Sequence, residues 1–245
     1  MDIKQPANCA AAPPPLLPVH LARGLVVCVR MDPRLLVNGL ILYLGLLVLL
    51  TFHEFGHAWM AWKCGDATAR SQGRVSLNPL VHIDPIGTVI LPLLLIFTAP
   101  GGFFAGWAKP VPVDPDNLRN PRTDEIMITL AGPWMNLLLA VAIMALARLG
   151  HAIQAGGLVE VSLNLAHLSL LLCFFNLLPI PPLDGSQVVR SLIGMSHETY
   201  HQIARYGIFI LILVLQFPLV QRTLNTVTTN SWLTIGDWFG MPLGG

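Results

Sequence analysis

A metal-ligand pattern inside an apolar stretch constrains this chain more than any other feature. The stretch 35–62 reads LLVNGLILYLGLLVLLTFHEFGHAWMAW and is apolar enough to cross a bilayer as a helix, yet it carries His53, Glu54 and His57. Ionisable groups in a membrane helix are costly and need partners. Two histidines four residues apart lie on one helix face. The HExxH order therefore predicts that both imidazoles bind one Zn²⁺, with Glu54 beside a water on the metal.

The composition indicates an integral membrane protein in a lipid bilayer. Of the 245 residues, 54% are hydrophobic and only 11% are charged, with a mean hydropathy of +0.65. Soluble domains carry roughly 25% charged residues. The net charge of +1 gives no electrostatic reason to expect nucleic acid as a partner. The cysteines show no paired spacing, so neither a disulfide framework nor a cysteine zinc site is predicted.

Breaks in the hydrophobic pattern divide the chain into three parts. Residues 1–34 include the segment AAPPPLLP and a second methionine at position 31, so we expect a disordered or non-native leader. Residues 35–220 are predicted to form the membrane-embedded domain. Residues 221–245 contain aromatic side chains suited to a membrane interface and are expected to form a tail. The predicted clear spans of the domain are 35–62, 125–149, 158–180 and 203–220.

Two segments between the first two spans are less regular. Residues 63–85 are polar, with glycine and proline breakers and a strand-like run at 74–77, which predicts a small hairpin-like loop. Residues 86–106 are apolar but interrupted by prolines and glycines, which predicts a broken or re-entrant segment. The predicted fold class is an all-α membrane protein, a polytopic helical bundle with a three-helix catalytic core and a small β-like or re-entrant loop region.

A third metal ligand is predicted at Asp184, in the sequence PPLDG that follows the third span. A catalytic zinc site has three protein ligands and one open position. The prolines before Asp184 unwind a helix end, and Gly185 allows a tight turn. The alternative reading is an ordinary aspartate in a helix-end turn. Elsewhere, His82 lies beside Asp84, where we expect a structural hydrogen bond.

Three motifs, FHEFGHAWMA, AGPWMN and FFNLLPIPPLDG, resemble the site-2 protease family of intramembrane zinc metalloproteases. The similarity runs over about 35–191 and includes SLNPLVHIDPIGT and GWAKPVPV, which are typical of compact bacterial members. The resemblance implies zinc ligands at His53, His57 and Asp184, and a catalytic glutamate at Glu54. Neither a PDZ domain nor a CBS pair is expected.

The resemblance also places the family's polar residue of the middle core helix at Asn136. Its amide either donates to the substrate carbonyl and the developing oxyanion or forms a hydrogen bond between packed spans. If the spans alternate in direction, His57, Asn136 and Asp184 meet at one membrane face. Basic residues outside 1–30 are concentrated on that side, so the positive-inside rule predicts a site near the cytoplasmic face of the cell membrane.

The implied reaction is zinc-assisted hydrolysis of peptide bonds within or near the membrane helices of single-span proteins, in regulated intramembrane proteolysis. Glu54 would take a proton from water and pass it to the leaving amine, and the run 70–77 would pair with extended substrate by strand addition. Two alternatives from other classes stay open: a membrane metal-ion carrier and a proteolytically silent protein that binds helices. A carrier more often shows repeated halves, and no internal repeat is visible.

Overall fold

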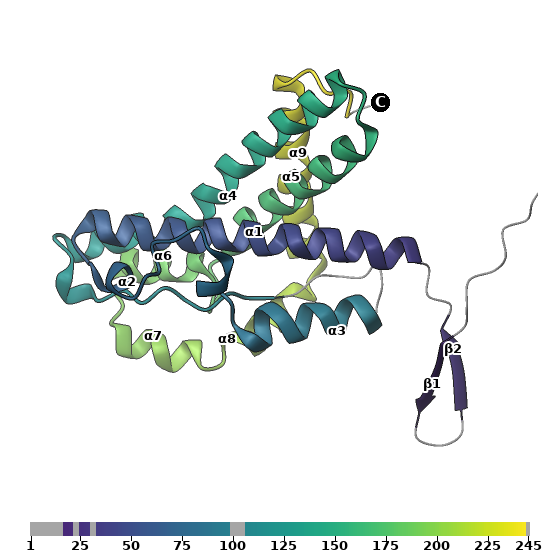
Figure 1. The fold of residues 1–245 in the computed structure, drawn as a ribbon. Coiled ribbons are helices and arrows are strands. Elements are labelled where there is room, and N and C mark those ends of the chain that lie inside the picture. The colour runs from purple at the N-terminus through teal and green to yellow at the C-terminus, as the bar shows by residue number, and fades with distance from the viewer. Residues whose placement is uncertain (1–16, 22–24, 30–32, 99–105, 244–245) are drawn as a thin grey trace, which may run out of the picture.

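Three long helices dominate the computed structural model, which describes residues 17–21, 25–29, 33–98 and 106–243. They are α1 (Pro33–Cys64), α4 (Pro121–Ala152) and α5 (Gly156–Asn176), and each is long and apolar enough to cross a membrane. Helix α4 packs against both α1 and α5, and Figure 1 shows α4 and α5 side by side above α1. The predicted all-α polytopic membrane fold is confirmed.

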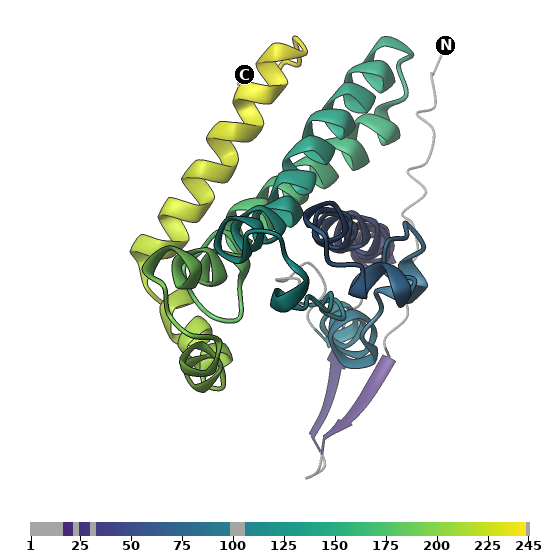
Figure 2. The same cartoon turned by 90° about the vertical axis from the view of Figure 1, so that its left-hand side faces the viewer.

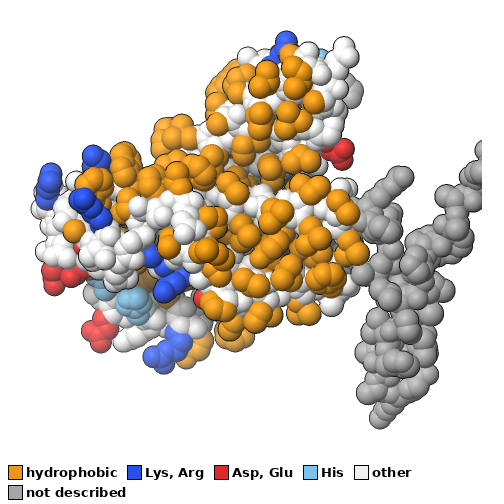
Figure 3. All heavy atoms as spheres, viewed as in Figure 1, with side chains coloured by type: hydrophobic (Ala, Val, Ile, Leu, Met, Phe, Trp, Pro, Cys, Tyr) orange, Lys and Arg blue, Asp and Glu red, His pale blue; other side chains and the backbone are white. Residues whose placement is uncertain are grey.

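The surface of α1 is suited to lipid. Large apolar side chains such as Leu40, Leu44 and Val48 are exposed along it. Figure 3 shows a nearly continuous apolar surface over this helix, whereas lysine and arginine gather toward its C-terminal end. An exposed apolar face of this size is expected where acyl chains replace water.

Helices α4, α5 and α9 (Pro218–Trp238) form the main bundle, and Figure 2 shows them running alongside one another. Small residues of α4 and α5, such as Ala140 and Ala166, are fully buried in its core and allow the helices to approach closely. The indole N–H of Trp232 donates to the carbonyl of Leu163 (3.2 Å). The boundary predicted at residue 220 therefore falls inside a helix that belongs to the bundle.

The span predicted at 203–220 is not one straight helix. The stretch divides among the end of α7 (His197–Ala204), α8 (Gly207–Leu215) and the start of α9, and α8 and α9 are bent by 82° relative to each other. The cause is Pro218, which forces the preceding residue into an extended conformation and begins a new helix. Helix α8 instead packs on the loop that precedes α6 (Asp184–Ile193).

The hairpin-like loop predicted at 63–85 is also wrong. Within this segment the structure has a short helix α2 (Thr68–Ser71) and a 3-10 turn η1 (Pro79–Val81), with no strand. Asp66 accepts hydrogen bonds from the backbone N–H and hydroxyl of Thr68, which starts α2. The guanidinium of Arg74 donates to backbone carbonyls of Lys109 and Pro110. These side-chain bonds hold the segment in place of a β ladder.

The apolar segment after it is short, as predicted. A π-helical turn η2 (Pro85–Ile90) runs into α3 (Leu91–Thr98), and the two together are shorter than a straight span. The hydroxyl of Tyr43 on α1 donates to the carbonyl of Thr88 (3.0 Å), which fixes η2 against α1. A further 3-10 turn, η3 (Pro115–Asn117), precedes α4.

The described strands lie in the stretch expected to be a leader. Strand β1 (Leu17–Leu21) pairs antiparallel with β2 (Leu25–Val29), with Val19 opposite Val27. Residues 1–16, which include the proline-rich segment, lie outside the described residues. The β-like region expected between the first two spans has no strand among its described residues, and the strands at 17–29 lie in a stretch for which no β element was expected.

Candidate metal centre

Helix α1 presents two histidines on one face. His53 and His57 are 4% and 8% exposed, their rings pack edge to face with centroids 4.7 Å apart, and their Nε2 atoms lie 3.0 Å apart. This is the geometry that four-residue spacing dictates on a helix. Glu54 stands between them in the sequence and is only partly buried. The helix by itself therefore brings together two potential metal ligands.

Helix α4 orients the second histidine. The Nδ1–H of His57 donates to the carbonyl of Ile128 (2.7 Å), a bond that joins α1 to α4. With its proton held at Nδ1, the ring presents an unprotonated Nε2. Imidazoles that bind metals are usually oriented by a bond of this kind.

Gly132 forms the wall behind the two imidazoles. A Cβ atom at this position would lie 2.3 Å from Nε2 of His57 and 2.7 Å from Nε2 of His53. Real Cβ atoms essentially never approach other atoms below 3.0 Å. The missing side chain of Gly132 is therefore what leaves room at the nitrogen atoms.

The third predicted ligand reaches the same place from a different helix. Asp184 lies eight residues beyond the end of α5 at Asn176 and is the first residue of α6. Its Oδ2 is 3.2 Å from Nε2 of His53 and 3.4 Å from Nε2 of His57. No larger residue fits at Gly185, where a Cβ would lie 2.2 Å from the carbonyl oxygen of Leu177.

The three atoms fit a zinc ion. In the described part of the chain, His53, His57 and Asp184 are the group of ligand-type side chains whose atoms lie within 4.8 Å of one another. Zinc with bonds of about 2.0–2.1 Å in a tetrahedron holds its ligand atoms roughly 3.3 Å apart, close to the distances here. The Oδ2 atom is buried and has no hydrogen-bond partner among the described residues, as expected for a ligand atom.

The charge state of Asp184 agrees with this arrangement. Burial raises the pKa of its carboxyl group, but without a metal the neighbouring His57 and His53, when protonated at Nε2, lower it by more, and the pKa lies well below its usual range. The group is therefore a carboxylate near neutral pH, which is the form that binds a metal.

Asn136 lies behind the site in contact with the first histidine. It is fully buried, its Nδ2 is 3.1 Å from Nδ1 of His53, and its Oδ1 has no partner among the described residues. A histidine that binds metal through Nε2 carries its proton on Nδ1 and needs an acceptor there. Turning the amide over supplies Oδ1 as that acceptor and satisfies both groups. Of the two roles considered for Asn136, the geometry favours the contact between helices.

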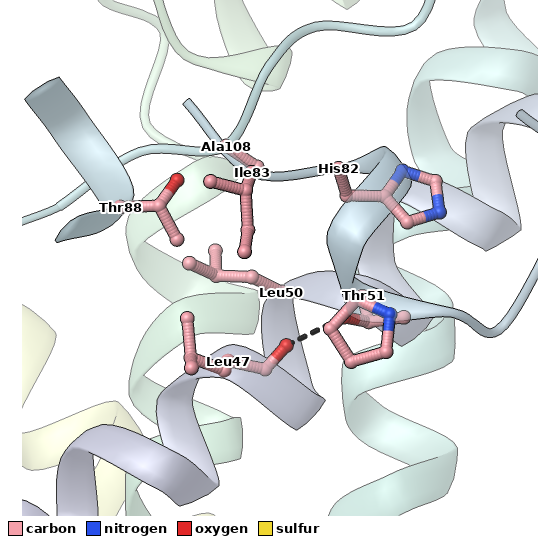
Figure 4. Close-up of a pocket in the computed structure, with 8 residues that line it drawn as sticks. Leu47, Leu50, Thr51, His82, Ile83, Thr88 and Ala108 are labelled. Carbon is pink, nitrogen blue, oxygen red and sulfur yellow. Dashed lines mark hydrogen bonds between the residues drawn. The ribbon is translucent and has the colours of Figure 1, made fainter. Parts of the chain in front are cut away.

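A small cavity lies one turn before His53 on α1. It lies between α1 and the segment from η1 to η2, as Figure 4 shows, and Leu47, Leu50 and Thr51 contribute from α1. The hydroxyl of Thr51 is used within the helix, where it donates to the carbonyl of Leu47 (2.6 Å). None of the predicted site residues lines this cavity, so it is separate from the metal centre.

Comparison with known proteins agrees with the geometry. The sequence matches Peptidase family M50 over residues 41–156 and 145–215, which together make up most of the chain. The chain belongs to this family. The resemblance to the site-2 proteases is thereby confirmed.

Several relatives of this M50 peptidase have been named. The Bacillus subtilis (strain 168) protein "Putative zinc metalloprotease YwhC" is 38% identical over 186 residues, which cover 73% of this chain and 81% of YwhC. Proteins named "Putative zinc metalloprotease Rip2" are 34% identical in Mycolicibacterium smegmatis (73% of this chain, 67% of the relative) and in Mycobacterium tuberculosis H37Rv (77% and 68%). No solved structure matches the chain.

Four of the residues that meet at this site were predicted from the sequence, whereas the roles of Ile128 and Gly132 were not. The structure brings His53, His57, Asp184 and Asn136 together, and their catalytic and ligand roles stay predictions. The carbonyl of Ile128 could not be found from side-chain types. Gly132 had a signal, because it lies four residues before Asn136 and so shares its helix face.

Proposed function

We propose that this chain, a metalloprotease of the M50 type, hydrolyses peptide bonds within or near the membrane helices of single-span proteins, with one Zn²⁺ held by His53, His57 and Asp184. The observation that carries the proposal is the convergence of three ligand atoms against Gly132, on a helix apolar enough to span a bilayer. The zinc metalloprotease names of the relatives support the choice of metal.

The residues of the chain divide the chemistry among them. A bound Zn²⁺ supplies Lewis acidity and acidifies water. His57 and His53 keep their protons at Nδ1, toward Ile128 and Asn136, so that both Nε2 atoms face the metal position. Glu54 takes a proton from water on its carboxylate and later gives that proton to the leaving amine.

The substrate class follows from the surroundings of the site. A peptide bond inside a membrane helix is hidden by the helix's own hydrogen bonds, so it must unwind locally before it can be cut. The exposed apolar surface of α1 supports a location in the bilayer, where the membrane segment of a substrate would also lie. Exposed basic residues such as Lys63, Arg70, Arg119 and Arg122 lie at the end of the molecule near the site, which supports a position near the cytoplasmic face.

The test compares wild type with Glu54→Gln, each co-expressed with candidate single-span proteins and purified for zinc analysis. We expect Glu54→Gln to keep one zinc per chain and to lose cleavage by roughly 10²–10⁴-fold, because the proton acceptor is gone. Asp184→Asn is the control for the metal and should lose zinc as well as cleavage. Full cleavage by a zinc-loaded Glu54→Gln variant would refute the role of Glu54, whereas zinc binding by the wild type without cleavage of any candidate would favour the metal-carrier reading.

A further inference from the structure

A buried polar cluster joins the start of α4 to α6 and α7, away from the ligand atoms. The carboxylate of Glu125 accepts hydrogen bonds from the guanidinium of Arg190 and from the hydroxyl of Ser191 (2.9 Å) through Oε2. Its Oε1 accepts a hydrogen bond from Nε2–H of His197 (2.8 Å). Arg190 and Ser191 are each 5% exposed. Glu125, Arg190 and Ser191 therefore form a buried connection between helices, whereas His197, whose side chain is 51% exposed, lies at its solvated edge.

The position of Glu125 on α4 relates the cluster to the metal centre. Glu125, Ile128, Gly132 and Asn136 follow one another at intervals of three, four and four residues, so they share one face of the helix. Three of these residues touch or approach the histidines of α1. The fourth, Glu125, holds α6. One face of α4 thus contacts both helices that supply the ligand atoms.

Helix α6 depends on polar contacts for its position. Asp184 is its first residue and Arg190 lies six residues later, about 9 Å along the helix axis. Near the N-terminus of α6, the hydroxyl of Ser186 lies 2.8 Å from that of Tyr200 on α7. Toward its C-terminus, the bonds of Arg190 and Ser191 to Glu125 fix the helix on α4. A helix held at both ends has a defined distance from its first residue to the histidines.

We propose that Glu125 and Arg190 are positioning residues for Asp184, and that their ion pair sets the fit of the third ligand to the metal. The inference rests on the proposed function only for the assignment of Asp184 as a ligand. A buried ion pair contributes little net stability compared with an apolar contact, since both charges must be desolvated. The role of the ion pair here is geometric, because it fixes the position of α6 along α4.

The experiment measures metal binding by the full-length protein in detergent, without substrate. Zinc affinity is obtained by competition with a chromophoric chelator, and Co²⁺ is used as a spectroscopic probe of the ligand geometry. We expect Glu125→Gln to weaken zinc binding by roughly 10–100-fold, the range found when partners behind metal ligands are removed. The visible absorption of bound Co²⁺ should also change in shape, which a loss of stability alone would not cause.

Three further variants make the outcome decisive. Ser191→Ala removes one bond to Glu125 without stranding a charge, so it tests the same idea if Glu125→Gln does not fold, with a smaller loss of affinity. Arg222→Gln removes an exposed cationic side chain of α9, outside the α4–α6 contact, and should leave zinc binding unchanged. Asp184→Asn tests the ligand assignment separately.

The results separate the two proposals. Folded Glu125→Gln and Ser191→Ala proteins with wild-type zinc affinity and an unchanged Co²⁺ spectrum would overturn the positioning role. Unchanged metal binding in Asp184→Asn would instead overturn the ligand assignment in the proposed function.

Discussion

The most direct test of the metal centre is the substitution Gly132→Ala. In the interior of a helix, alanine is normally more favourable than glycine by roughly 0.5–1 kcal/mol. Here the added Cβ would lie 2.3 Å from Nε2 of His57 and 2.7 Å from Nε2 of His53. Withdrawal of the neighbouring helix would break close packing between α1 and α4, because Gly56 of α1 lies against the carbonyl of Ala131, where a Cβ would be only 2.7 Å away.

The size of the expected effect follows from these distances. To restore an ordinary contact, the His57 ring must move by about 1 Å, and a misplacement of that size can cost about 10²-fold in rate. We therefore expect Gly132→Ala to fold and to lose at least 100-fold in zinc affinity and in cleavage. Zinc content by mass spectrometry, chelator competition and thermal unfolding in detergent separate loss of the site from loss of the fold.

A matched control is available in the same bundle. Gly157, near the start of α5, has nothing within 4 Å of the position a Cβ would take. Gly157→Ala should therefore keep zinc and activity and be neutral or slightly stabilising. Wild-type zinc affinity in Gly132→Ala, with the fold intact, would show that the space beside Gly132 is not the metal position.

Three other predictions concern Asn136, the bound metal and Asp66. Asn136→Ala should weaken zinc binding by roughly 10–100-fold, whereas Asn136→Asp keeps an acceptor for Nδ1–H of His53 and should recover most of it; an equal loss of zinc affinity in both variants would contradict the acceptor role. Removal of zinc by a chelator should lower stability by about 2.7 kcal/mol if the metal was present at 100 times its dissociation constant, and an unchanged thermal midpoint would argue against a bound metal. Asp66 is buried and accepts hydrogen bonds from Thr68, Asp114 and Asn117. Burial raises the pKa of its carboxyl group, but these hydrogen bonds lower the pKa by more, so that it lies below its ordinary value. The stabilisation that the Asp66 carboxylate contributes is therefore complete above its unfolded pKa of about 3.9, and it is lost as the pH falls through the lower pKa of the folded state. Limited proteolysis of 66–118 should therefore accelerate below about pH 4 in the wild type. In Asp66→Asn the rate of proteolysis should depend less on pH.

The parts of the fold that could be predicted are those set by local periodicity and hydropathy. The positions of α1, α4 and α5 follow from runs of apolar residues, and the pairing of His53 with His57 follows from helix geometry alone. Asp184 was found from its residue type and its place after PPL. Each of these signals lies within a few adjacent residues.

The parts that could not be predicted depend on contacts between distant segments. The run 74–77 has strand-like residues, but Arg74 is drawn inward by carbonyls 35 and 36 residues further along the chain. The apolar composition of 203–220 is that of a span, yet Pro218 bends it. His197 is exposed, yet it bonds to Glu125 across 72 residues. Neither composition nor spacing carries information about such partners.

The same distinction explains how the metal centre is assembled. The two histidines are held by one helix and need only the correct rotamers, which Ile128 and Asn136 fix. The carboxylate arrives on a separate short helix, and its approach depends on contacts made far from the metal. A site built in this way tolerates little change in how α6 packs on α4, because a small shift of the helix moves Oδ2 away from both nitrogens at once. Substitutions of non-ligand residues that weaken metal binding should therefore cluster on the α4–α6 contact rather than along α1.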